Sequence, residues 1–102
     1  MILWLGTMRL DLSRDADADL DDILEYGVKQ FGLEVGRKYY FRFDETFRFL
    51  RQFPEAGAVR DELDGNPRSF GHERIFYDIE DERIFVLRIL HHAMDHRRAF
   101  KR

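Results

Sequence analysis

The chain has 102 residues, of which 44% are hydrophobic and 15% aromatic, so it can fold as one domain and is not an intrinsically disordered chain. It holds no cysteine, which excludes disulfide bonds and thiolate metal sites. The net charge of −3 combines an acidic segment at residues 11–25 with a basic one at residues 88–102, which indicates either two partner surfaces of opposite charge or two solvated ends.

The first five residues are all apolar. This opening has no charged leader and is too short for the apolar region of a signal peptide. No other segment approaches the roughly 20 apolar residues of a membrane span. We therefore expect a cytoplasmic protein that makes no membrane contact. Met8 is an alternative translation start, so we divide the chain into an extension at residues 1–7, expected to be flexible, and a single domain at residues 8–102.

Residues 9–13 alternate between polar and apolar side chains, which predicts a short strand with one buried face. Ser13 suits the N-cap of a following helix, whose first turn carries acidic residues that favour the positive end of the helix dipole. Apolar residues then recur at three- and four-residue intervals up to Phe31. This spacing predicts an amphipathic helix that ends at Gly32.

A second amphipathic helix is predicted directly after the first, and Pro54 prevents it from continuing further. Because the connection is so short, the two helices are expected to form an antiparallel hairpin. Gly36 has no side chain, so it would let the helices approach closely.

Two aromatic residues of the second helix, Phe41 and Phe49, lie off its apolar stripe. At 100° per residue Phe41 lies nearly opposite Phe43, beside Arg37 and Arg48. An aromatic side chain framed by arginines on an outer helix face suits a groove in a partner. The alternative is an isolated surface Phe, or one covered by the tail of the same chain.

Residues 54–67 contain two prolines and two glycines and are predicted to form a loop, followed by a short strand at residues 68–70. Richer strand candidates cover residues 73–79 and 83–91, with a polar turn at residues 80–82. The last strand is expected to place Phe85, Leu87 and Ile89 on one face and Ile84, Val86, Arg88 and Leu90 on the other. Both faces are largely apolar, as in a central strand covered on two sides. The helices cover one side, so we expect the tail, a second copy or a separate protein to cover the other.

The order of these elements and several short motifs resemble the ParE branch of the RelE/ParE toxin superfamily over residues 9–100. The matching pieces are residues 18–23 with Tyr26, residues 31–32, Tyr39 and Phe43, and residues 53–57, 68–70 and 75–77. The most specific piece is Leu-Arg-Ile-Leu-His-His-Ala-Met-Asp at residues 87–95. Many ParE-like chains place a histidine directly before the third strand, whereas this chain has Glu73 there and His72 one position earlier, so no role is transferred to His72.

The resemblance implies an α+β fold with an N-terminal strand, an antiparallel helix hairpin and three further strands in a small antiparallel sheet. It also implies a toxin of a type II toxin–antitoxin system that needs no cofactor or metal. Such a toxin binds and poisons DNA gyrase, and a ParD-like antitoxin neutralises it by wrapping the helices and the sheet. The antitoxin-binding residues are then expected to be Leu20, Ile23, Arg37, Phe41, Arg48, Phe49, Ile84 and Val86. The target-binding residues are expected to be Arg88, His91, His92, Asp95, Arg97 and Arg98.

The RelE branch of the same superfamily offers a second function, which is ribosome-dependent cleavage of messenger RNA. In that case Arg68 and Arg88 would hold phosphate, and His91 or His92 would exchange protons near neutral pH. The tail has no tyrosine, however, and Phe100 cannot move a proton, so only half of such a site is present. A third possibility is a non-toxic homologue that only binds an antitoxin.

Two further interpretations concern the charged residues near the end of the chain. Arg88 lies in an apolar strand, so a structural pairing with Asp95 or Asp78 competes with a target contact. The basic tail alone is a weak signal for nucleic acid, and the acidic first helix argues against direct binding to DNA. The His and Asp residues at 91–96 match no strong metal-ligand spacing.

Overall fold

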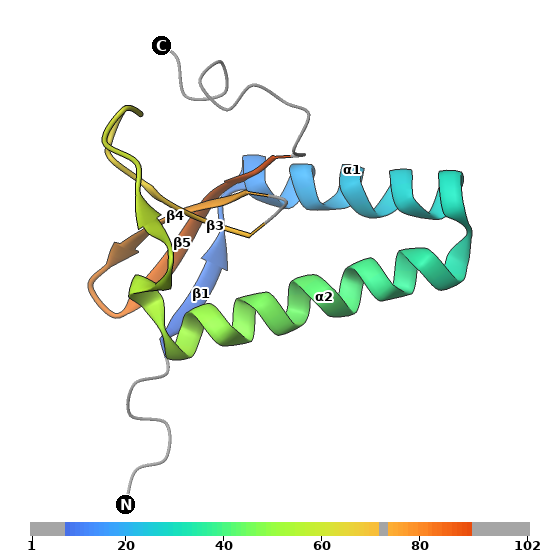
Figure 1. Cartoon of the computed structure of the whole chain (residues 1–102), viewed down its shortest axis with the longest axis horizontal. Helices are drawn as coiled ribbons and strands as arrows, with labels where there is room; N and C mark the ends of the chain where they lie inside the picture. The colour runs from blue at the N-terminus through green and yellow to red at the C-terminus, as the bar shows by residue number, and fades with distance from the viewer. Residues whose placement is uncertain (1–7, 72–73, 91–102) are drawn as a thin grey trace, which may run out of the picture.

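A computed structural model describes residues 8–71 and 74–90 of the chain (Figure 1). Figure 1 shows two long antiparallel helices that project away from a small sheet. In chain order the elements are β1 (Arg9–Leu12), α1 (Arg14–Phe31), α2 (Leu33–Gln52), the 3-10 helix η1 (Pro54–Ala56), β2 (Ala58–Val59), β3 (Arg68–Phe70), β4 (Ile75–Glu80) and β5 (Arg83–Ile89). The predicted α+β class and the order of the predicted elements are therefore confirmed.

The sheet differs from the expected one in two details. Its strand order is β1-β5-β4-β3-β2, and β1 runs parallel to β5, whereas the other neighbours are antiparallel. A tight hairpin turn would force two neighbouring strands to run antiparallel. The helix hairpin and three strands separate β1 from β5 in the sequence, so this long connection also allows the parallel direction. Residues 58–59, which were predicted to be loop, form the fifth strand at the edge.

The main core lies between the sheet and the helix hairpin. Its buried members are Ala16, Phe43, Leu50, Ile75, Tyr77, Ile84, Val86 and Ile89. The two helices contribute small and large side chains from their facing stripes, and the strands contribute the residues that point toward them. A second, smaller cluster of Leu63, Phe76 and Leu90 is also buried. Successive strand residues point to opposite faces, so Phe76 places this cluster on the other side of the sheet from Tyr77.

The face assignment predicted for the last strand is wrong beyond Val86. The register shifts between Phe76 and Tyr77, so that Tyr77 pairs with Val86 while Phe76 pairs with Arg88. The strand therefore gains one extra residue at Leu87, as in a β-bulge. As a result Ile89 joins the main core with Val86, although the two were predicted to lie on opposite faces.

The chain itself covers part of the second face of the sheet. Leu63 belongs to the segment between β2 and β3, and it packs with Phe76 and Leu90. We had expected the tail, a second copy or another protein to provide this cover. The prediction overlooked Leu63 because a single apolar residue in a polar loop carries no periodic signal.

The helix hairpin forms as its local signals predict. The Ser13 side chain accepts a hydrogen bond from the Ala16 N–H at 2.9 Å, which caps α1. Gly32 ends α1 with a backbone φ of +91°, and α2 begins at the next residue. A Cβ atom on Gly36 would overlap the side chain of Val28, so the predicted close approach of the helices is confirmed. Within the described ranges, neither helix has the length and apolar composition needed to cross a membrane.

Candidate partner-binding surface

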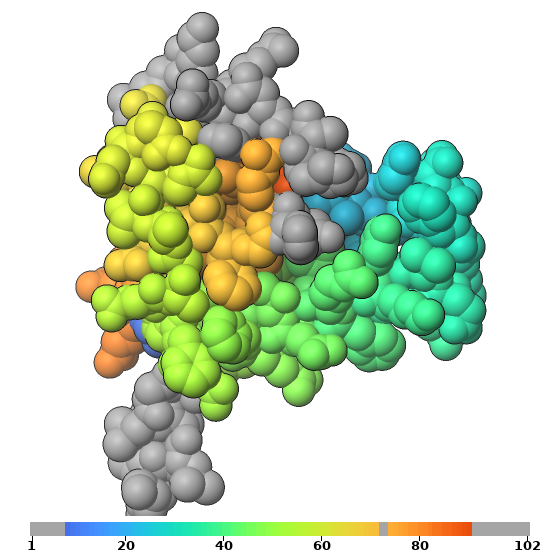
Figure 2. All heavy atoms as spheres, in the orientation of Figure 1, coloured from blue at the N-terminus to red at the C-terminus, as the bar shows by residue number. Residues whose placement is uncertain are grey.

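Large apolar side chains are exposed mainly on the helix hairpin and at its C-terminal end. The exposed ones are Tyr26, Val28, Phe31, Leu33, Tyr40, Phe41, Phe49, Phe53, Val59 and Ile79. Figure 2 shows α2 at the surface of the face in view, next to the segment that follows it. Exposed apolar side chains that lie together, as Tyr40 does with Phe41 and Phe49 with Phe53, mark sites of interaction with other proteins more often than scattered single residues do.

The outer stripe of α2 combines aromatic and charged side chains. Arg37, Phe41, Glu45 and Arg48 follow one another at four- and three-residue intervals, so they share one helix face. Phe41 is 59% exposed, and its ring meets the ring of Tyr40 edge to face, with 5.7 Å between the centroids. These four residues and Phe49, which lies on a different stripe of the same helix, are called the α2 surface below. Arg37, Phe41 and Arg48 are exposed there, as the sequence led us to expect.

Arg48 remains accessible to a partner although it forms an ion pair within the helix. The guanidinium of Arg48 lies 3.2 Å from the carboxylate of Asp44, one turn earlier, and the Arg48 side chain is still three-quarters exposed. A pair this exposed contributes little to stability. Arg48 can therefore turn toward a carboxylate of a partner at small cost.

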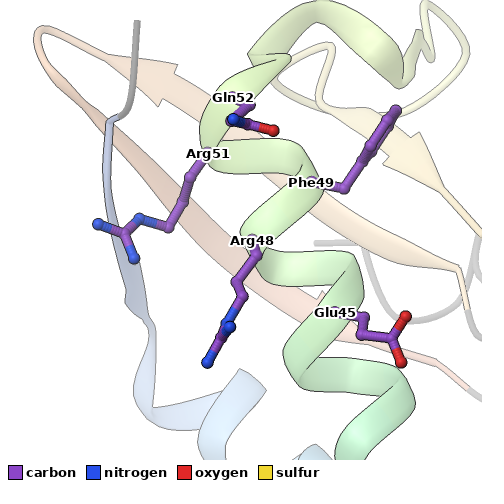
Figure 3. A pocket seen from close by; sticks show the side chains of 5 residues that line it. All are labelled: Glu45, Arg48, Phe49, Arg51 and Gln52. Atoms are coloured by element: carbon purple, nitrogen blue, oxygen red, sulfur yellow. The ribbon is translucent and has the colours of Figure 1, made fainter. Parts of the chain in front are cut away.

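A shallow hollow follows the C-terminal half of α2 (Figure 3). Its lining residues are Glu45, Arg48, Phe49, Arg51 and Gln52. In Figure 3 Arg48 and Arg51 lie on the side of α2 that faces β1, whereas Phe49 points the opposite way. The Nε atom of Arg51 donates to the main-chain oxygen of Met8 at 2.7 Å, so this arginine is held by the start of the domain.

A second, mainly apolar groove of about 530 Å³ adjoins this hollow and shares Phe49 and Gln52 with it. Its lining residues, called the aromatic groove below, are Phe49, Gln52, Phe53, Pro54, Glu55 and Ala56. The Phe49 ring stacks on the Phe70 ring with 5.5 Å between centroids and lies 5.1 Å from that of Phe53. The sequence reasoning missed Phe53 as a surface residue. Its position directly before the helix-ending Pro54 was the available signal.

Buried polar contacts fix the far wall of the aromatic groove. The Tyr77 hydroxyl donates to the Pro54 carbonyl at 2.6 Å and accepts from the Gly57 N–H at 2.9 Å. Burial raises the pKa of Tyr77 above its ordinary value, so the hydroxyl keeps the proton that it donates. Arg68 adds a hydrogen bond of 2.8 Å to the carbonyl of Gly57. The segment after α2 is thus held rigidly against the sheet.

Four predicted antitoxin-binding residues lie in or against the main core. Ile84 and Val86 are fully buried, so the prediction that they contact a partner is wrong in the folded chain. The helix hairpin covers the face of β5 to which both belong. Leu20 and Ile23 of α1 are partly buried and pack against the same core.

Arg88 pairs with a residue that the sequence reasoning did not consider. Its Nε and Nη2 atoms donate to the two carboxylate oxygens of Asp19 in α1, at 2.7 and 2.9 Å. These hydrogen bonds raise the pKa of Arg88 above its ordinary value. The expected pairing with Asp78 is therefore wrong, and Asp95 lies outside the described residues. The expected structural role of Arg88 is supported through a different carboxylate.

The two arginines proposed for phosphate binding do not converge. Arg68 pairs across the sheet with Tyr77, and Arg88 pairs with Phe76. Tyr77 and Phe76 belong to the core clusters on opposite sides of the sheet. Each arginine is moreover engaged within the chain, Arg68 by main-chain carbonyls and Arg88 by Asp19.

Several predicted site residues lie outside the described part of the chain. These are His72, His91, His92, Asp95, Arg97 and Arg98. Among residues 8–71 and 74–90, no three acidic or histidine side chains are grouped so that they could hold a metal ion.

Within residues 8–71 and 74–90, this small α+β domain exposes aromatic side chains on its helix hairpin, a feature typical of surfaces that bind another protein. A family model described as the ParE toxin of the type II toxin–antitoxin system parDE matches residues 10–96. The chain is 32% identical over 88 residues to Toxin ParE1 of Caulobacter vibrioides. The matched region covers 84% of this chain and 91% of that protein. It is also similar to a solved structure described as the chromosomal ParDE TA system from P. aeruginosa, with a TM-score of 0.69 and 28% identity over 84% of this chain and 97% of that one. The chain belongs to the ParE toxin family of type II toxin–antitoxin systems, as the sequence motifs predicted.

Proposed function

We propose that this toxin arrests growth by binding DNA gyrase and that a ParD-like antitoxin neutralises it by covering the α2 surface. Membership of the ParE family supports the role of toxin. The observation that carries the antitoxin proposal is the exposure of Phe41 and Arg48 on one stripe of α2, the helix whose C-terminal end borders the aromatic groove. Both proposed partners act in the cytoplasm, where we place the toxin as well.

The chemistry of the α2 surface suggests the kind of antitoxin segment that binds it. Phe49 and Phe53 offer an apolar seat, while Arg37 and Arg48 supply positive charge on the neighbouring helix stripe. An amphipathic segment can place an apolar side chain in the groove and a carboxylate beside Arg48. Complementary charge would also speed the encounter and orient the segment. We therefore expect the neutralising segment of the antitoxin to be acidic and amphipathic.

Inhibition by binding is favoured over catalysis. Cleavage of RNA without a metal needs cationic groups and proton-transferring groups that converge on one phosphate. Arg68 and Arg88 are both held by hydrogen bonds within the chain. Their cross-strand partners, Tyr77 and Phe76, are buried on opposite sides of the sheet. We place the gyrase contacts at residues His91, His92, Asp95, Arg97 and Arg98, which follow β5 in the sequence.

A gyrase assay tests this proposal. Purified toxin is added to gyrase, plasmid and ATP, and we expect linear cleaved plasmid that disappears when the cognate antitoxin is added first. A translating ribosome extract is treated in parallel. Transcripts cut at ribosome-occupied codons would support the RelE-type activity instead. No effect in either assay, with tight antitoxin binding retained, would identify a non-toxic homologue.

A further inference from the structure

Where β1 stops, Ser13 and Asp19 continue the hydrogen bonding along the same edge of β5. β1 ends at Leu12, and its last main-chain partner on β5 is Val86. The Ser13 N–H then donates to the Val86 carbonyl, and the Ser13 hydroxyl donates to the Leu87 carbonyl, both at 2.8 Å. Two residues further along β5, the N–H of Ile89 donates to Asp19 at 3.0 Å.

Asp19 therefore binds both the main chain and a side chain of the same strand. One of its carboxylate oxygens accepts from Ile89 and from Nε of Arg88, and the other accepts from Nη2 of Arg88. The side chains are only 15% and 24% exposed, for Asp19 and Arg88 respectively. Hydrogen bonds that involve ionised groups are shorter and stronger than neutral ones, and the two-point contact with an arginine also fixes direction.

A main-chain hydrogen bond also holds the opposite edge of β5, next to Ile89. The Leu90 N–H donates to the Arg74 carbonyl at 3.2 Å. The end of β5 is thus fastened from both sides, with Asp19 on one edge and Arg74, the residue before β4, on the other. Directly after this point the sequence continues with His91 and His92, the first residues of the proposed gyrase contact.

We propose that Asp19 is a positioning residue for toxicity, because it fastens Arg88 and Ile89 at the end of β5, directly before residues 91–98 in the sequence. This inference rests on the proposed function, since it assumes that these residues contact the target. Asp19 contacts β5, and its proposed effect on the target acts through that strand. The antitoxin contact on α2 lies on the other helix of the hairpin, so the two activities should separate when Asp19 is changed.

The chain offers a matched control at the other end of β5. Arg83, at the start of the strand, pairs with Asp11 of β1 at 3.0 Å. This contact is also an aspartate–arginine pair between β5 and the N-terminal region, but it lies far along the strand from Ile89. Asp11→Asn removes a comparable carboxylate and should leave the end of β5 unchanged.

The test compares the variants Asp19→Asn and Asp11→Asn with the unchanged toxin, all expressed as the full chain. The readouts are plasmid cleavage with gyrase, growth arrest without antitoxin, affinity for the cognate antitoxin, and hydrogen exchange at the Ile89 amide. We expect Asp19→Asn to need about tenfold more toxin for the same cleavage, the scale expected for one charge-assisted hydrogen bond. We also expect faster exchange at Ile89 and unchanged antitoxin affinity. Asp11→Asn should match the unchanged toxin in all four.

Arg88→Lys provides a second variant in case Asp19→Asn does not fold. A lysine keeps the positive charge but cannot form the two parallel hydrogen bonds, so toxicity should again fall while antitoxin binding persists. Full toxicity of both variants would overturn the proposal, and so would a loss of antitoxin binding in step with toxicity. If the unchanged toxin neither cleaves plasmid with gyrase nor arrests growth, the proposed function fails, and the positioning role fails with it. Growth arrest without any gyrase effect would refute only the choice of target.

Discussion

The hydroxyl of Tyr77 joins the strand meander to the segment that shapes the aromatic groove. It donates to the Pro54 carbonyl and accepts from the Gly57 N–H, and the whole side chain is buried. A Cβ atom on Gly57 would lie 2.7 Å from this hydroxyl, so only glycine fits at that position. One aromatic residue of the core thereby determines the form of a surface that lies 20 or more residues away in the sequence.

Tyr77→Phe should lower the free energy of unfolding by about 1–3 kcal/mol, because it leaves a main-chain donor and a carbonyl without their partner. Urea denaturation followed by circular dichroism measures this loss. Antitoxin affinity should fall as well, since the groove wall loses its anchor. Tyr40→Phe serves as the control because Tyr40 is 55% exposed. Equal urea midpoints for the Tyr77 and Tyr40 variants would contradict the role given to the Tyr77 hydroxyl.

Asp78 gives a residue-level prediction for the effect of pH. Burial, and to a lesser extent the carboxylate of Glu80, raise the pKa of Asp78 above its ordinary value of 3.8. The folded chain therefore binds this proton at a higher pH than the unfolded chain does. The resulting contribution to stability is complete below pH 3.8 and is lost as the pH rises through the folded-state pKa.

Asp78→Asn removes this partly buried charge and should raise the melting temperature at pH 7. The difference from the unchanged protein should shrink as the pH falls toward 3.8, because the raised pKa means that the carboxyl of the folded protein takes up its proton above that pH more readily than in the unfolded chain. Thermal melts of both proteins across that range measure the difference. A constant difference at every pH would show that the charge of Asp78 is not its cause.

At the scale of elements, the helix hairpin could be predicted because its signals are local. The Ser13 cap, the break at Gly32 and the stop at Pro54 each depend on a few neighbouring residues, and all three lie where the sequence places them. Two exposed residues of the α2 surface, Phe41 and Arg48, were predicted in the same way, from their angular position on one helix.

The last strand and its contacts could not be predicted to the same degree. Leu87, Ile89 and Leu90 are all apolar, so the hydrophobic pattern is satisfied equally well with and without a bulge. The bulge reverses the faces beyond Val86. The partner of Arg88 lies 69 residues earlier, and only the packing of α1 against β5 brings Asp19 to it.

The close approach of the helices leads to a prediction about Gly36. Alanine favours a helix over glycine by about 1 kcal/mol, so Gly36→Ala would stabilise an isolated helix. Here the added methyl group overlaps the side chain of Val28, which is stiff because it is branched at Cβ. We expect Gly36→Ala to destabilise the toxin by about 1–2 kcal/mol.

The double variant Val28→Ala/Gly36→Ala tests the cause of this loss. With the valine branches removed, the added methyl group has room, so the double variant should be more stable than the sum of the two single changes predicts. Chemical denaturation of all four proteins completes the cycle. Strict additivity would mean that the two side chains do not compete for the same space.

At the scale of the whole molecule, two separate regions carry the two proposed contacts. The α2 surface and the aromatic groove lie at one side of the hairpin, and the end of β5 lies against α1, held by Asp19. This arrangement predicts that neutralisation and toxicity can be separated by substitution. Changes on α2 should affect the antitoxin, and changes around Asp19 should affect the target.

The most direct measurement is the growth of cells that produce both the toxin and its antitoxin. We expect the variant Phe41→Ala/Arg48→Ala to arrest growth despite the antitoxin, because it lacks the anchors of the α2 surface and keeps the end of β5 intact. Lys29→Ala, which breaks an exposed pair with Glu25 on α1, should be neutralised normally. The contradicting result is a Phe41/Arg48 variant that arrests growth when it is produced without antitoxin, but that the antitoxin neutralises to the same extent as the unchanged toxin. In that case the antitoxin does not act through α2.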